Sequence, residues 1–65
     1  MTGTIKRKAE KGFGFIRPDE GTKDIFFHMT GLDGIHFDDL NEGNRVEFEV
    51  EDSEKGPRAI GIVFA

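Results

Sequence analysis

The chain has 65 residues, no cysteine and a formal net charge of −4, a length that allows one domain, residues 1–65, with a small hydrophobic core. Without cysteine it can form neither disulfides nor a cysteine-based zinc site, which fits a reducing, cytoplasmic setting. No stretch has the apolar character of a signal peptide or the length of a membrane span. We therefore expect a soluble cytoplasmic domain without membrane contact.

Five short segments alternate apolar and polar residues between turn formers, and this period of two predicts strands. In chain order the predicted strands are residues 4–6, 12–17, 23–28, 45–51 and 58–64. Residues 18–21 and 52–57 are predicted turns, and the glycine- and acid-rich residues 29–44 form a long connection with room for one short helical turn. An all-β, five-stranded antiparallel β-barrel follows, because a sandwich usually needs more strands and a barrel leaves no exposed edge.

Alternation also assigns phenylalanines to the inner or the outer face of the predicted strands. Three residues of the fourth strand share its apolar face and are expected in the core: Val46, Phe48 and Val50. In the third strand Phe27 faces away from Asp24, whereas Phe26 shares the face of this acidic residue and of His28. Because the face with the carboxylate is the wet one, we expect Phe27 in the core and Phe26 at the surface.

Phe13 and Phe15 share one face of the second predicted strand, and the other face carries two glycines and Ile16. Arg17 continues the face of the rings, and glycine within a strand often marks tight curvature at a barrel corner. We therefore expect both rings to be exposed. The alternative assignment places both of them in the core.

Charge is divided unevenly along the chain. Residues 1–31 hold six basic and four acidic side chains, whereas residues 32–65 hold three basic and nine acidic ones. The ring-bearing half is therefore basic although the chain as a whole is acidic. Exposed rings interleaved with cations suit a single strand of nucleic acid, because bases stack on the rings and cations follow the phosphates. The alternative is a protein-interaction module whose aromatic face docks a partner protein.

The segment Lys11-Gly12-Phe13-Gly14-Phe15-Ile16 matches the ribonucleoprotein-1 pattern at its first five positions. The RNA-recognition-motif fold is excluded, because it needs two helices between its strands and places its two motifs in the reverse order. With Asp24-Ile25-Phe26-Phe27-His28 following across a short hairpin, the sequence instead resembles the cold-shock domain family. These bacterial proteins have the OB-fold and bind single-stranded RNA and DNA.

The resemblance implies an RNA chaperone that keeps transcripts unstructured without catalysis or ATP. Carried over position by position, the stacking residues would be Phe13, Phe15, Phe26, His28 and Phe37. Polar or phosphate contacts would come from Lys6, Lys11, Asp24 and Arg58. The basic cluster beside the rings adds Arg7 to this candidate site.

The chain departs from the family pattern near the end of the first strand. Family members usually carry Lys-Trp-Phe-Asn there, and this chain has Lys6-Arg7-Lys8-Ala9, so charge replaces a stacking tryptophan. Met29 stands where a phenylalanine usually follows the histidine, and a thioether stacks less well than a ring. We expect fewer stacking sites, steeper salt dependence and weaker affinity than in a typical member.

The chain shows no arrangement typical of an enzyme. Ser53 lies in a predicted turn with no histidine nearby, and Asp38 and Asp39 are adjacent rather than separated as an acid and a base. His28 and His36 lack the spacing of metal ligands. We expect a non-enzymatic monomer that needs no cofactor or metal and has single-stranded RNA or DNA as its partner.

Overall fold

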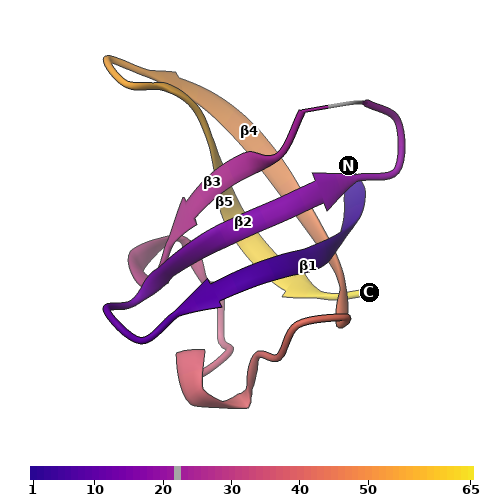
Figure 1. The fold of residues 1–65 in the computed structure, drawn as a ribbon, viewed down its shortest axis with the longest axis vertical. Helices are drawn as coiled ribbons and strands as arrows, with labels where there is room; N and C mark the ends of the chain where they lie inside the picture. Colours follow the sequence, from indigo (N-terminus) through magenta and orange to yellow (C-terminus); the bar gives the residue numbers. More distant parts are fainter. Residues whose placement is uncertain (22) are drawn as a thin grey trace.

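The computed structural model describes residues 1–21 and 23–65, and its main elements are five strands that close into a barrel. The strands are β1 (Thr2–Ala9), β2 (Phe13–Pro18), β3 (Ile25–His28), β4 (Arg45–Ser53) and β5 (Gly56–Phe64). In Figure 1, β1, β2 and β3 lie side by side in front, and β4 and β5 cross behind them. The predicted all-β barrel is confirmed.

Around the barrel the strands follow the order β1, β2, β3, β5, β4, and β4 closes the ring by pairing with β1. Four pairings are antiparallel, whereas β3 and β5 run parallel. The predicted antiparallel barrel thus contains one parallel pair, and the reason is topological. Directions cannot alternate around a closed ring with an odd number of strands, so one parallel pair is required.

Nine apolar side chains fill the barrel and form its core: Ile5, Ile16, Ile25, Phe27, Leu40, Val46, Phe48, Ala59 and Ile62. Phe27 and Phe48 are 0% and 3% exposed, as predicted from alternation. Burying a side chain of this size stabilises the fold by about 1.5–3 kcal/mol. A domain this small therefore depends on each of these residues.

The predicted core position of Val50 is wrong, because this side chain is 37% exposed. β1 pairs with β4 only from Arg45 to Glu47, so Val50 lies beyond the part of β4 that the barrel encloses. The β4–β5 hairpin continues past this point and projects from the barrel in Figure 1. The predicted turn at residues 52–57 is also too long, since β4 extends to Ser53 and β5 begins at Gly56.

Gly14 explains why β2 turns its rings outward. A Cβ atom at this position would lie 2.8 and 2.9 Å from two ring atoms of Phe27, and real Cβ contacts are longer. The inner face of β2 therefore has no room for a side chain at this level. The alternation of the strand then places Phe13 and Phe15 on the outer face.

The connection between β3 and β4 closes one end of the barrel. It contains two 3-10 turns, η1 (Met29–Gly31) and η2 (Phe37–Asp39), where the sequence indicates one. Leu40 follows η2 and is fully buried, and Leu32 packs against the core from the same connection. Within the described residues, no helical segment has the length and apolarity needed to cross a membrane.

Candidate nucleic-acid interface

The outer face of the barrel carries a row of four side chains on four neighbouring strands. Strand register pairs Arg7 with Phe15, Phe15 with Phe26, and Phe26 with Arg58. Paired residues point to the same side of a sheet, and neighbouring strands lie about 5 Å apart. The register therefore sets two rings side by side with an arginine at each end. We call these four residues the ring row.

A second, shorter row lies next to the ring row and contains Ala9, Phe13 and His28. The Phe13 and Phe26 rings stack with their centroids 5.9 Å apart and an interplanar angle of 26°. Phe15 meets Phe26 edge to face, also at 5.9 Å. Phe26 is exposed, as predicted, and Phe13 and Phe15 lie on the predicted face but are half-buried, since the rings shield one another.

A β-bulge in β1 sets the position of Arg7. Ile5 pairs with Ile16 and Arg7 pairs with Phe15, so β1 has one extra residue between these two pairs and β2 has none. The extra residue, Lys6, leaves both cations exposed while Ile5 stays in the core. No pattern in the sequence indicates this bulge, and without it Arg7 would not stand beside a ring.

Asp24 binds two of the cations near the rings. Its Oδ1 accepts a hydrogen bond from Arg17 Nε at 2.6 Å, and its Oδ2 lies 3.4 Å from Lys6 Nζ. The hydrogen bond from Arg17 lowers the pKa of Asp24 below its ordinary value, and Lys6 adds to the effect. Any anion that approaches Lys6 must therefore compete with this carboxylate.

Arg58 is held by a different carboxylate. Its Nε donates to Glu51 Oε1 at 2.6 Å, and its Nη2 contacts the same oxygen. Arg58 also borders a hollow of about 710 Å³ between β3 and the tip of the β4–β5 hairpin, which Phe26, His28 and Pro57 help to line. The sequence predicts only a turn at the hairpin tip, and the tip lies near the rings only in the folded barrel.

Phe37 lies apart from both rows, in η2 at the closed end of the barrel. Its ring centroid is 6.5 Å from that of Phe27, and Lys8 Nζ lies 4.7 Å from the same centroid. Lys8 pairs with Gly14, so its side chain starts on the inner side of β1 and reaches over the barrel end. The ring therefore already has a cation–π partner, and a base could stack on the face that Lys8 covers only after Lys8 moves.

Lys11 also lies away from the ring row, in the turn between β1 and β2. It lines a hollow of about 330 Å³ together with Met29 and Phe37. The Met29 N–H donates to the carbonyl oxygen of Gly12 at 2.8 Å, and this bond holds the exposed thioether beside the turn. The predicted residues thus form two groups, one along the ring row and one around this hollow.

His28 is exposed beside Phe13, and its Nδ1 accepts a hydrogen bond from the Thr30 N–H at 3.2 Å. The neutral ring then carries its proton on Nε2, which no hydrogen bond within the described residues engages. No group of three or more potential metal ligands occurs in residues 1–21 and 23–65. The position of His28 in the shorter row is one that a base could reach.

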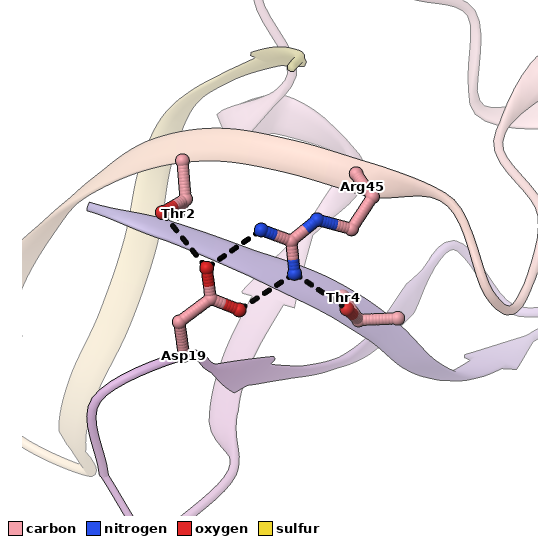
Figure 2. A network of polar contacts seen from close by, with 4 residues as sticks. All are labelled: Thr2, Thr4, Asp19 and Arg45. Carbon is pink, nitrogen blue, oxygen red and sulfur yellow. Dashed lines mark hydrogen bonds and ion pairs between the residues drawn. The ribbon is translucent and has the colours of Figure 1, made fainter.

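A separate polar network lies where β1, β4 and the end of β2 meet (Figure 2). Both oxygens of Asp19 accept from the guanidinium of Arg45 at 2.6 Å, and Arg45 Nη1 also donates to Thr4 Oγ1 at 3.2 Å. Thr2 Oγ1 donates to Asp19 at 3.0 Å. The hydrogen bond from Arg45 lowers the pKa of Asp19, and the same pair raises the pKa of Arg45. This network joins three parts of the barrel and includes none of the candidate site residues.

Residues 1–64 match the family model described as the 'Cold-shock' DNA-binding domain. The chain belongs to the cold-shock domain family. It is 48% identical over 64 residues to the cold shock-like protein CspG of Escherichia coli K12, covering 97% of this chain and 91% of that protein. It is 52% identical over 61 residues to the probable cold shock protein A of Mycolicibacterium smegmatis, covering 92% of this chain and 91% of that protein.

A solved structure titled "drosophila Unr CSD456" has the same fold, with a TM-score of 0.82 and 35% sequence identity. The match covers 98% of this cold-shock domain but only 26% of the solved chain, so it compares one domain with part of a longer protein. These comparisons confirm the family resemblance and the OB-fold.

Proposed function

We propose that this cold-shock domain binds single-stranded nucleic acid, RNA or DNA, across the ring row. The observation that carries the proposal is the strand register, which places Phe15 and Phe26 side by side between Arg7 and Arg58. Each stacked base contributes about 1–3 kcal/mol, and every base has a π-face. A surface with rings in the middle and cations at the ends matches the chemistry of a single strand.

The remaining candidate residues extend this surface. Phe13 and His28 offer further stacking positions in the shorter row, and Phe37 becomes available if Lys8 moves away. Phosphates would contact Lys6, Arg7, Lys11 and Arg58, while Asp24 would hold Lys6 in place or accept a hydrogen bond from a base. We thus propose one extended binding surface along the two rows, together with a separate stacking position at Phe37.

Binding of this kind would make the protein an RNA chaperone. A ligand that binds the unpaired strand and not the duplex shifts the equilibrium toward the unpaired state by mass action, without ATP or a cofactor. We expect the protein to open a marginally stable RNA hairpin carrying a fluorophore and a quencher. Fluorescence that stays quenched at saturating protein would contradict the chaperone role and leave binding itself intact.

The test of binding uses the fluorescence anisotropy of a labelled oligo-dT or oligo-U heptamer, because the protein has no tryptophan or tyrosine to report on its own state. With four candidate cations, the logarithm of the binding constant should fall with the logarithm of salt at a slope of up to about −3. An unlabelled single strand should compete, and a duplex of the same length should compete poorly.

Absence of binding to either heptamer at low salt would contradict the proposal. The alternative, in which the aromatic face docks a partner protein, would then take its place. Binding that competes equally well with duplex would also count against the ring row, because a duplex offers phosphates but keeps its bases stacked inside. Both outcomes are read from the same titrations.

A further inference from the structure

A hollow of about 560 Å³ lies beside Phe15, and its lining combines a ring, two cations and two carboxylates: Lys6, Arg7, Phe15, Asp24 and Glu42. A base that stacks on Phe15 would turn its polar edge toward these groups. Cations at the end of a stacking surface can bind a phosphate without contacting the base. Cations and carboxylates around one ring can bind both the hydrogen-bond acceptors and the hydrogen-bond donors on the edge of a base. The composition of this hollow therefore suggests base selection.

Arg7 is the lining residue with its donors most available. Lys6 and Arg17 are held by Asp24, and Arg58 is held by Glu51. Arg7 is exposed and makes no ion pair or side-chain hydrogen bond with the described residues. Arg7 pairs with Phe15 across the sheet and lines the same hollow, so its planar guanidinium can meet the edge of a base on that ring without giving up a partner.

The acceptors of the hollow differ in how fully they are used. Both oxygens of Asp24 already face cations, Arg17 and Lys6. Glu42 accepts the Lys8 backbone N–H through Oε2 at 3.2 Å, and its Oε1 has no hydrogen-bond partner in the part of the chain that the structure describes. The hollow thus offers a guanidinium fork and one free carboxylate oxygen to a ligand.

We propose that this hollow selects guanine, with Arg7 donating to O6 and N7 and Glu42 accepting from the N1–H and the 2-amino group. The inference rests on the proposed function, because it assigns a base to one stacking position of the ring row. Arginine pairs bidentately with the adjacent O6 and N7 acceptors of guanine. Guanine also carries adjacent donors on its Watson–Crick edge, which is accessible in a single strand.

The other bases satisfy the hollow less well. Adenine places a donor beside N7, so it offers the arginine fork one acceptor rather than two. Thymine and uracil have two carbonyl oxygens separated by an N–H, and the fork cannot engage both. Cytosine has adjacent acceptors, but its amino group is its only donor and lies on that same edge. Guanine alone serves the guanidinium and the carboxylate from two different edges.

The test compares labelled thymidine heptamers that carry one guanosine at each position in turn with the all-thymidine heptamer. At one position the wild type should bind the guanosine heptamer about fivefold or more tightly than the all-thymidine one, the low end expected for a bidentate arginine–guanine pair. Replacing that guanosine with 7-deazaguanosine removes N7 and should abolish most of the preference. Inosine keeps O6 and N7 and should retain part of it.

Variants distinguish recognition of the base from a general effect of charge. For each variant the measured quantity is the ratio of its affinity for the guanosine heptamer to its affinity for the all-thymidine heptamer. Arg7→Lys keeps the charge but loses the planar fork, so its ratio should fall well below that of the wild type. The matched control is Arg58→Lys, the same change at the other end of the ring row, whose ratio should stay as in the wild type. Glu42→Ala removes both acceptor oxygens, so it should lower the ratio in part and should no longer distinguish guanosine from inosine.

The outcomes distinguish failure of this inference from failure of the proposed function. Wild type that binds the all-thymidine heptamer but gains nothing from guanosine at any position would overturn the guanine assignment alone. A preference that stays at the wild-type value with Arg7→Lys or with 7-deazaguanosine would overturn the role of Arg7. Wild type that binds none of the heptamers would overturn both proposals.

Discussion

Strands β2 and β3 carry apolar side chains on both faces, and the two faces differ in burial and in surroundings. On the inner face Ile16 and Phe27 are fully buried. On the outer face Phe13, Phe15 and Phe26 keep part of their rings in contact with solvent. The outer rings shield one another at centroid distances of 5.9 Å instead of being covered by another layer.

The difference teaches that residue type alone does not separate a folding role from a binding role in this chain. Phe26 and Phe27 are neighbours in the sequence, yet one is 38% exposed and the other 0%. Phe15 and Phe26 each have an arginine as a lateral neighbour in the sheet, whereas Phe27 lies between Gly14 and Ala59. We therefore expect substitutions on the inner face to lower stability and those on the outer face to lower binding.

The largest expected effect is that of Phe27→Ala on the inner face. Truncating a buried phenylalanine costs about 3–5 kcal/mol of unfolding free energy, a large part of the stability of a domain this small. Urea denaturation followed by circular dichroism measures the loss. Phe48→Ala should behave in the same way, and a change below about 1 kcal/mol in either variant would contradict the assignment of these rings to the core.

Phe15→Ala on the outer face should weaken heptamer binding by about 1–3 kcal/mol, because it removes one stacking platform. Its unfolding free energy should change less than that of Phe27→Ala. Phe64→Ala is the matched control, since Phe64 is 46% exposed but lies opposite Val46 at the far end of β5. Equal loss of binding in both variants would mean that exposed rings act non-specifically.

Glu51→Gln tests the partner of Arg58 at one end of the ring row. Glu51 holds this arginine, and under the proposed function it would compete with phosphate, so its removal should tighten heptamer binding at low salt. Exposed ion pairs are worth about 0.2–1 kcal/mol, and the gain should therefore be severalfold at most. Glu49→Gln removes the same charge from β4 without touching a described ion pair, and an equal gain there would assign the effect to net charge alone.

The smallest expected effect belongs to Asp19→Asn, outside both faces (Figure 2). Arg45 lowers the pKa of Asp19 below its ordinary value of 3.8, so the folded state keeps this carboxylate charged to lower pH than the unfolded state does. The stability it contributes is fully present above about pH 5 and is lost as the pH falls through the lowered pKa.

The melting temperature of wild type should therefore exceed that of Asp19→Asn by a small margin at neutral pH. The margin should shrink below pH 3.8, the ordinary value for Asp19. A margin that grows with acid would contradict the sign of the pKa shift. Heptamer binding at neutral pH should be the same in both proteins, because the network contains none of the candidate site residues.

The sequence predicts most of the fold because alternation and turn formers are local signals. Phe27 and Phe48 are assigned to the core from their neighbours in the chain, and Gly14 marks the face of β2 that has no room for a side chain. Val50 is misassigned because its pattern continues past the point where β1 stops covering β4. Alternation reports which face a residue occupies but not whether another strand lies opposite that face.

The sequence predicts which rings belong to the candidate site, but it does not predict how the site residues are arranged across the strands. The rings follow from the two phenylalanine-rich segments, but the order Arg7, Phe15, Phe26, Arg58 depends on a bulge at Lys6 and on a parallel contact between distant strands. Neither has a local sequence signal. Lys8 lies over Phe37, and Glu42 lines the hollow beside Phe15, only because of tertiary packing.

The most direct test of the division between the two faces is Phe26→Ala, examined by thermal melting and by heptamer anisotropy in the same buffer. We predict a melting temperature near that of wild type together with binding weakened by about 1–3 kcal/mol. A melting temperature lowered as far as that of Phe27→Ala, with heptamer affinity unchanged, would show that the outer rings serve the fold and would contradict the proposed binding surface.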